Sequence, residues 1–179
     1  MKRREEQIRP FCNLGGRIRR IFDLQVASTY RGIYPLIGQE PEGMKRKILD
    51  VGCGAMPYKF LFTQRGWQYL GMDIENAGAD FDYQVENVLR YDGHTFPLPD
   101  GKMDMVFHSE VLEHVYDTAH FLPEYNRVLR PGGTLLFTVP FQARYHYIPN
   151  DYWRFTPSAM QALLKTAGFQ DISIFPPRE

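Results

Sequence analysis

Ile48-Leu49-Asp50-Val51-Gly52-Cys53-Gly54 is the stretch of sequence that decides the fold. An apolar run interrupted only by Asp50 passes directly into two glycines, which is typical of a buried strand that ends in a tight turn. Glycines at such a turn let the backbone approach a ligand, because no Cβ stands in the way. A dinucleotide-binding fingerprint would place another glycine three residues after Gly54, and Pro57 stands there. The stretch therefore predicts a ligand-binding loop and disfavours a nicotinamide cofactor.

Strand-like and helix-like segments alternate along the rest of the chain. Strands are expected at residues 47–53, 67–74, 83–88, 103–109, 134–140 and 171–175. Helices are expected at residues 58–65, 109–115, 119–129 and 157–167, the last with Thr156 as its N-cap and Gly168 as its stop. This alternation predicts an α/β fold with a doubly wound, Rossmann-like, mostly parallel sheet. Such sheets bind ligands at the carboxyl ends of their strands.

The charges of the chain are segregated, although 21 basic and 21 acidic residues give a net charge of zero over 179 residues. Residues 1–20 hold seven basic and two acidic residues, whereas residues 50–117 hold four basic and twelve acidic residues. The acidic middle favours a cationic ligand over a polyanion. We expect a basic helical cap over residues 1–43 and a ligand-binding domain over residues 44–179.

The sequence also indicates where in the cell the protein is found. It contains no apolar run long enough to span a membrane and no secretory leader pattern, and its two cysteines do not suggest a disulfide. We therefore expect a cytoplasmic protein without a membrane span.

A second acidic residue lies at an informative distance from the loop. Asp73 ends the second expected strand, 19 residues after Gly54, where a carboxylate can accept both hydroxyls of a ribose. Asp50 ends the first strand, where it suits an ammonium group and repels a pyrophosphate. The two acids predict a ligand that carries an amine and a ribose.

These motifs, with those at residues 96–101, 103–115 and 129–133, resemble the class I S-adenosylmethionine-dependent methyltransferases over roughly residues 45–175. The closest resemblance is to the type 11-like subgroup with a Leu-Glu-His signature. It implies that the glycine loop holds the methionine moiety of S-adenosyl-L-methionine, that Asp73 holds its ribose and that Asp92 meets its adenine amino group. The full expected cofactor set is Asp50, Gly52, Cys53, Gly54, Tyr58, Asp73, Ile74, Asp92, Gly93, His108 and Ser109.

The resemblance also implies a strand order of 3-2-1-4-5 followed by an edge strand. The family's last antiparallel strand is expected either to be missing or to be cut off by a truncation of the chain, and in both cases an apolar edge is left that a homodimer would cover. The sequence departs from the family at Met56, where a third glycine is common.

A cluster of ionisable residues follows the fourth expected strand. On a helix, Glu110, Glu113 and His114 would share one face, being spaced at i, i+3 and i+4. His114 and Glu110 are the candidate catalytic residues, with His114 as a general base. Alternatively Glu110, Glu113 and His114 bind a divalent cation, as the resemblance to ubiquinone-pathway O-methyltransferases and small-RNA 2′-O-methyltransferases suggests. A purely structural role is the third option.

A long aromatic segment follows the fifth expected strand, over residues 140–155. Such segments at the carboxyl end of a strand are usually functional. The candidate acceptor-binding residues are His146, Asn150, Asp151, Tyr152, Trp153 and Arg154. The alternative is that Trp153 and Phe155 are core anchors and that Arg154 pairs with a nearby acid.

The predicted function is methyl transfer from S-adenosylmethionine to an oxygen or nitrogen of a small molecule or glycan. One alternative is a catalytically silent methyltransferase-like partner subunit. Another is an RNA methyltransferase that places the basic N-terminus on phosphates, although the charge of the middle segment makes a nucleic acid partner the weaker expectation.

Overall fold

The computed structural model describes residues 26–38, 45–75, 87–146 and 150–175. The chain divides into two units, Met1–Ile37 and Gly38–Glu179, and each is described by itself. In the first unit, residues 26–33 are helical and are followed by the 3-10 turn η1 (Tyr34–Leu36). The basic segment at residues 1–20 lies outside the described residues. No helix in the described ranges is both long and apolar enough to cross a membrane.

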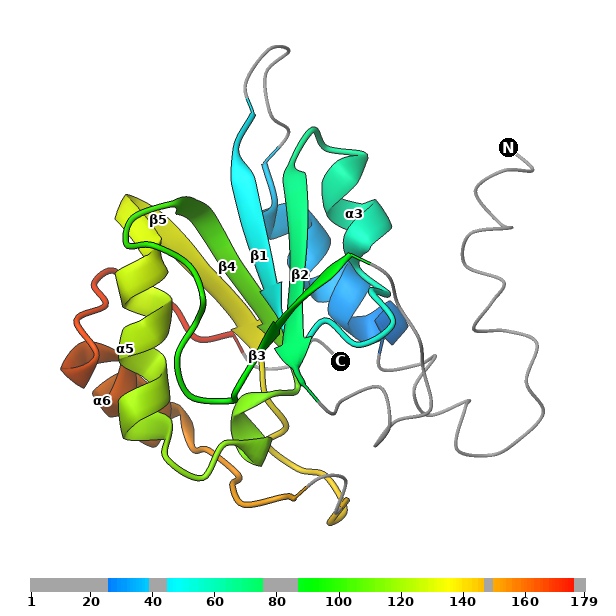
Figure 1. Cartoon of the computed structure of the whole chain (residues 1–179). Helices are drawn as coiled ribbons and strands as arrows, with labels where there is room; N and C mark the ends of the chain where they lie inside the picture. Colours follow the sequence, from blue (N-terminus) through cyan, green and yellow to red (C-terminus); the bar gives the residue numbers. More distant parts are fainter. Residues whose placement is uncertain (1–25, 39–44, 76–86, 147–149, 176–179) are drawn as a thin grey trace. The chain divides into compact units, whose positions relative to one another are not determined.

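Within the described ranges, five parallel strands form one sheet in the order β3-β2-β1-β4-β5 (Figure 1), which confirms the expected order and the doubly wound fold. The strands are β1 (Lys47–Val51), β2 (Gln68–Ile74), β3 (Val88–Tyr91), β4 (Met103–Ser109) and β5 (Leu129–Thr138). β1 pairs with β2 on one side and with β4 on the other. β2 and β3 are added on one side of β1, and β4 and β5 are added on its other side. The glycine loop after β1 therefore lies at the switch point where such sheets bind ligands.

Helices cover the two faces of the sheet, as right-handed crossovers require. They are α3 (Lys59–Thr63), α5 (Thr118–Val128) and α6 (Pro157–Thr166), and α5 and α6 lie side by side in Figure 1. Alternate residues of β4 show which face each helix covers. Phe107 packs on Phe62 of α3, with ring centroids 5.2 Å apart, whereas His108 stacks on Tyr125 of α5 at the same distance.

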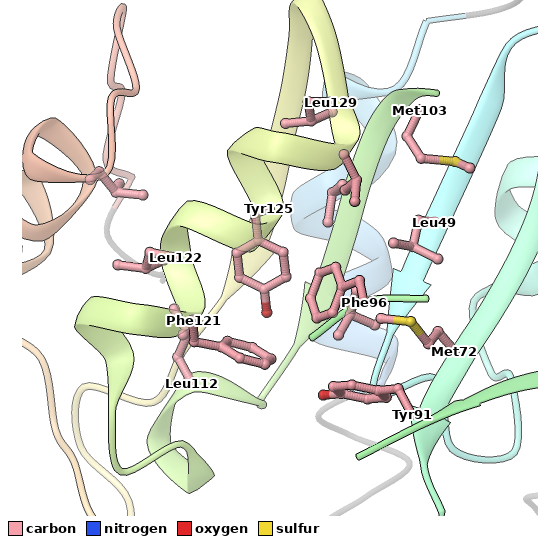
Figure 2. Packing of buried hydrophobic residues seen from close by; sticks show 14 of the residues in the cluster. Leu49, Met72, Tyr91, Phe96, Met103, Leu112, Phe121, Leu122, Tyr125 and Leu129 are labelled. Carbon is pink, nitrogen blue, oxygen red and sulfur yellow. The ribbon is translucent and has the colours of Figure 1, made fainter. Parts of the chain in front are cut away.

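The α5 face of the sheet holds the main hydrophobic core. Figure 2 shows Phe121 and Tyr125 of α5 pointing toward Phe96, which joins them to Tyr91 of β3 and Met72 of β2. The ring of Phe96 packs at 5.4 to 5.5 Å from the rings of Tyr91, Phe121 and Tyr125. Offset and edge-on aromatic contacts of this kind add to the free energy gained by burying apolar surface. The core therefore fixes the strand ends that carry the site.

The expected start and stop of the last helix are confirmed. Thr156 Oγ1 accepts a hydrogen bond from Ala159 N–H at 3.2 Å, and Pro157 occupies the first turn. Gly168 follows the helix with a φ of +89°, a conformation that favours glycine.

Three strand predictions differ from the structure. The third strand runs over Val88–Tyr91 rather than 83–88, because the polar Arg90 hides its pattern; residues 76–86 lie outside the described part. The fifth strand starts at Leu129, not at residue 134, with a bulge that absorbs the Pro-Gly-Gly segment. The prediction of a strand at 171–175 is wrong: these residues lie outside the sheet, and Asp171 takes a φ of +51°. The homodimer expected at this edge stays a prediction.

The prediction of a helix over residues 109–115 is also wrong. Only a 3-10 turn, η2 (Leu112–His114), forms there. Glu110 N–H donates to the carbonyl of Thr138 on β5 at 3.0 Å, and Glu110 adopts a φ of +56°. Strand pairing therefore continues past Ser109 and the chain turns before any helix can begin. The expected helical face shared by Glu110, Glu113 and His114 does not exist.

Candidate functional site

The glycine loop leaves β1 with three residues in the left-handed backbone region. Gly52, Gly54 and Met56 have φ values of +66°, +52° and +56°. Between them, Cys53 is buried and its N–H donates to the carbonyl of Met72 on β2 at 3.1 Å. Burial raises the pKa of the Cys53 thiol, so the side chain stays protonated and inert. Met56 thus adopts the left-handed backbone conformation at a position where a glycine is common. Its Cβ makes this conformation less favourable than it would be for glycine.

Gly52 is also pressed against Val111, the residue that follows β4 and Glu110. A Cβ at position 52 would lie 2.5 Å from Val111 Cγ2, whereas a Cβ at Gly54 would meet nothing within 4 Å. Gly52→Ala is therefore expected to lower the free energy of unfolding by about 2 to 4 kcal/mol, and Gly54→Ala by about 1 to 2 kcal/mol. Urea unfolding of both variants measures the difference. A second change, Val111→Ala, should recover the difference; equal losses in both glycine variants would contradict the steric explanation.

Asp73 closes the loop from the end of β2. Its Oδ2 accepts a hydrogen bond from Gly54 N–H at 2.9 Å, and its Oδ1 accepts one from Ile74 N–H at 2.9 Å. The carboxylate is mostly buried. A carboxylate is the kind of group that accepts hydrogen bonds from ribose hydroxyls. The predicted ribose contact stays a prediction, and the structure adds that Asp73 fixes the path of the glycine loop.

Asp50 lies beneath the loop on the α3 face of the sheet. The side chain is 2% exposed, and the hydroxyl of Tyr69 on β2 donates to its Oδ2. Burial, only partly offset by this hydrogen bond, raises the pKa of Asp50 to about 7. A cation beside the carboxyl would favour its charged form.

Tyr58 and Ser109 meet between α3 and the end of β4. The Tyr58 hydroxyl and Ser109 Oγ share a hydrogen bond at 3.2 Å, and Ser109 Oγ lies 2.9 Å from Thr138 Oγ1. The ring of Tyr58 packs edge-on against Phe107. The structure thus brings two residues of the expected cofactor set together at the carboxyl ends of the strands.

Asp92 and Gly93 form a turn directly after β3. Asp92 Oδ1 accepts hydrogen bonds from the N–H groups of His94 and Thr95 at 2.8 and 2.9 Å, which lower the pKa of the exposed carboxyl. Gly93 has a φ of +86°, and a Cβ there would approach Ile74 within 3.8 Å. The turn places Asp92 near the end of β2, while its adenine contact stays a prediction.

His108 takes a different position from the one expected of a cofactor contact. Its ring is 0% exposed and is stacked between Tyr125 and Phe137, with centroid distances of 5.2 and 4.7 Å. Neither ring nitrogen has a hydrogen-bond partner within the described residues. Burial lowers the pKa of His108 to about 3, so the ring is neutral. The structure therefore assigns His108 to the core under α5 rather than to the open edge of the sheet.

Glu113 and His114 lie in the turn η2. The carboxylate of Glu113 is fully buried, and burial together with the charge of Glu110 raises its pKa to about 8. His114 is partly buried, which lowers the pKa of its imidazole, and its Nδ1 bonds to the carbonyl of Asn150. Glu110 lies outside this turn, between β4 and Val111, so the three residues are close in sequence but share no helical face.

The aromatic segment docks onto this turn. The carbonyl of Glu113 accepts hydrogen bonds from the N–H groups of Tyr152 and Trp153 at 2.8 and 3.3 Å, and Trp153 Nε1 donates to the carbonyl of Val115 at 3.0 Å. Tyr152 and Trp153 keep 45% and 39% of their surface exposed. Their rings pack around Tyr116, at 5.3 and 6.4 Å. Phe155 is buried in the core, as the structural alternative expected, whereas the same expectation for Trp153 is wrong because that residue stays exposed.

Asp151 forms hydrogen bonds to two other residues of the aromatic segment, Arg154 and His146. Its carboxylate binds both terminal nitrogens of Arg154, at 2.7 Å on the Oδ2 side, and accepts His146 N–H at 3.0 Å. These partners lower the pKa of Asp151, so it is ionised at neutral pH. The alternative in which Arg154 pairs with a nearby acid is therefore confirmed. All six expected acceptor residues lie around η2. Asn150, Tyr152 and Trp153 contact the turn directly, and Asp151 joins His146 and Arg154 to it.

Sequence reasoning missed three residues of this region: Tyr69, Val111 and Thr138. Tyr69 is a polar residue in an apolar strand, on the same face as Asp50, and this alternation was a usable signal. Val111 and Thr138 had no such signal, because their contacts with Gly52 and Ser109 depend on how β4 pairs with its neighbours.

Comparisons with known proteins identify the family independently of this geometry. A methyltransferase domain family matches residues 49–137. A probable S-adenosylmethionine-dependent methyltransferase of Mycolicibacterium smegmatis is 30% identical over 136 residues, which are 70% of this chain and 52% of the relative. The malonyl-(acyl-carrier protein) O-methyltransferase of Serratia marcescens is 32% identical over 106 residues, which are 58% of this chain and 42% of the relative. This chain thus spans about half the length of these two relatives.

A solved structure shares the fold. The S-adenosylmethionine-dependent methyltransferase from Archaeoglobus fulgidus superimposes with a TM-score of 0.64 at 22% identity, over 82% of this chain and 69% of that one. The fold, the glycine loop between two acidic strand ends and the matching domain lead to one conclusion. The chain belongs to the class I S-adenosylmethionine-dependent methyltransferases.

Proposed function

We propose that the protein transfers a methyl group from S-adenosylmethionine to an oxygen or nitrogen of a small molecule or glycan. One observation carries the proposal: the glycine loop is held between Asp50 and Asp73 at the switch point of the sheet, with Asp73 bonded to Gly54 N–H. This arrangement presents backbone and carboxylate groups to a ligand at the edge where α/β sheets bind them.

The residues present fit this cofactor. Open space lies beside Gly54 where a side chain would stand, so the backbone is accessible. Asp50 is a buried carboxyl, and a bound ammonium group would favour its ionised form. Asp73 lies at the end of β2, and its carboxylate is of the kind that accepts hydroxyl groups. The cofactor carries a sulfonium, an ammonium and a single carboxylate, so its net positive charge suits the acidic segment at residues 50–117.

In the proposed reaction, this chain acts mainly by positioning. S-adenosylmethionine supplies a methyl group on a sulfonium, which is open to in-line displacement. The glycine loop and Asp73 fix the donor side, while the segment at residues 150–154 lies against η2 and offers its aromatic face to the acceptor. Holding two reactants in line removes a large part of the entropic barrier. An amine acceptor that is already neutral needs no further proton transfer for its attack.

The exposed rings favour a flat or sugar-like acceptor. Tyr116 is 72% exposed and packs beside the partly exposed Tyr152 and Trp153. Rings of this kind present a broad apolar face with polar tips, which suits stacking on sugars and heteroaromatic groups. We propose that these three side chains contact the acceptor.

Calorimetry with S-adenosylmethionine tests the first half of the proposal. We expect one molecule to bind per chain, and methyl-labelled cofactor to yield a labelled product when the chain is incubated with a pool of small metabolites and glycans. Binding without any labelled product would favour the silent partner subunit. Absence of binding would overturn the proposal.

A further inference from the structure

Three metal-ligating side chains converge beside η2, from two segments that are 32 positions apart in sequence. Glu113, His114 and His146 each offer one ligand atom, and these atoms all lie within 4.8 Å of one another. Nε2 of His114 lies 3.8 Å from Oε1 of Glu113, and Nε2 of His146 lies 3.9 Å from the same oxygen. These separations exceed hydrogen-bond length and leave room for an ion between the three groups.

Both imidazoles are held by their other nitrogen. Nδ1 of His114 bonds to the carbonyl of Asn150. Nδ1 of His146 lies 3.1 Å from the carbonyl of Arg144 and 3.3 Å from Oδ2 of Asp151. Carbonyl and carboxylate oxygens only accept hydrogen bonds, so Nδ1 carries the proton on each ring. Each Nε2 therefore turns a lone pair toward Glu113, which is the arrangement that outer-shell groups impose on metal-binding histidines.

Glu113 supplies an independent indication. Its side chain is 0% exposed, and neither carboxylate oxygen has a hydrogen-bond partner within the described residues. Arg154, whose positive charge acts on Glu113, is instead paired with Asp151. An unpaired buried carboxyl is costly, and a cation that coordinates it removes that cost.

We propose that Glu113, His114 and His146 bind a divalent transition-metal cation of the Zn²⁺ or Mn²⁺ type. Two neutral imidazoles and one carboxylate suit such ions, whereas Mg²⁺ and Ca²⁺ prefer sets made of oxygen alone. The set replaces Glu110, which the sequence suggested, with His146 from the aromatic segment. Both nitrogens of His114 are then engaged, so His114 is a ligand and not a general base.

Three protein ligands leave at least one coordination position open. Glu113 and His114 lie shortly after the end of β4. Val111, which stands between β4 and these two ligands, contacts Gly52 of the glycine loop. If methyl transfer takes place as proposed above, on which this role rests, an acceptor oxygen can occupy the open position. Coordination lowers the pKa of a hydroxyl, which then loses its proton to solvent more easily. The site thus selects acceptors that carry an oxygen ligand near the methylated atom.

The test is a titration of the untagged full chain, stripped with a chelator, with Zn²⁺, Mn²⁺ and Mg²⁺ by calorimetry. We expect one transition-metal ion per chain and at least about tenfold weaker binding of Mg²⁺. His146→Ala and His114→Ala should each weaken Zn²⁺ binding by about a hundredfold or more. The matched control His120→Ala removes an exposed imidazole on α5 and should bind as the wild type does. Glu110→Gln should also retain binding within about twofold.

Equal affinity in His146→Ala and His120→Ala, or a loss confined to Glu110→Gln, would overturn the proposal. Circular dichroism of each variant shows whether the chain is folded. Co²⁺ added to the wild-type chain gives a measurement that needs no variant: a visible absorption spectrum with nitrogen ligands is expected, and the spectrum of the hydrated ion would overturn the site. Metal binding is measured without cofactor or acceptor, so its failure is distinguishable from a failure of methyl transfer.

Discussion

Asp73→Ala is expected to weaken S-adenosylmethionine binding by about thirty- to a hundred-and-fiftyfold, because hydrogen bonds to a charged acceptor contribute about 2 to 3 kcal/mol. The substitution removes the acceptor of Gly54 N–H, so the glycine loop loses one of its hydrogen bonds to β2. It also removes the carboxylate expected to bind the ribose. Calorimetric titration with S-adenosylmethionine measures the change. Asp73→Asn keeps one oxygen acceptor for Gly54 N–H, so its affinity for S-adenosylmethionine should lie between those of the wild type and Asp73→Ala.

Asp104→Ala is the matched control for this prediction. Asp104 is also a strand carboxylate, and it accepts hydrogen bonds from Arg130 Nε at 2.6 Å and Lys47 N–H at 2.8 Å. It lies near the start of β4, at the opposite end of the sheet from the glycine loop. Its loss should lower stability and leave cofactor affinity within about twofold. Equal affinities in the two alanine variants would show that Asp73 does not act at the cofactor.

His108→Phe is expected to change how the stability of the protein depends on pH. The pKa of His108 is lowered to about 3 by burial, from an ordinary value of 6.5, so the unfolded chain binds a proton that the native chain does not. The native state therefore loses stability as the pH falls below 6.5, by about 2 kcal/mol at pH 5. Phenylalanine keeps the stacking between Tyr125 and Phe137 without a titrating group.

Urea unfolding at pH 7.5 and pH 5 measures this effect. The quantity of interest is the change, between the two pH values, in the difference in unfolding free energy between the variant and the wild type. The stability of His108→Phe relative to the wild type should grow by about 2 kcal/mol between the two values, whatever the change in packing costs at either pH. The same substitution at His120, whose ring is exposed on α5, serves as the matched histidine-to-phenylalanine control. Cofactor affinity of His108→Phe should stay within about twofold of the wild type. A constant stability difference, or a large loss of affinity, would return His108 to the cofactor site.

Local patterns predicted much of the fold. The apolar run into Gly52 and Gly54, the position of Asp73 and the cap at Thr156 each depend on neighbours within a few residues, and the structure keeps all of them. The strand order 3-2-1-4-5 came from the family resemblance and is confirmed. The predictions for residues 109–115 and 171–175 were wrong because their backbone hydrogen bonds depend on distant partners, such as the carbonyl of Thr138.

The sequence by itself therefore determined the α/β class, the glycine loop and its two acidic strand ends, since turns, caps and alternating strands are short-range consequences of side-chain chemistry. Tertiary structure alone decided which side chains meet. It buried His108 under α5, because the packing of that helix selects the face of β4 that is covered. It also brought His146 to Glu113 and His114, because hydrogen bonds from Tyr152 and Trp153 hold the aromatic segment against η2.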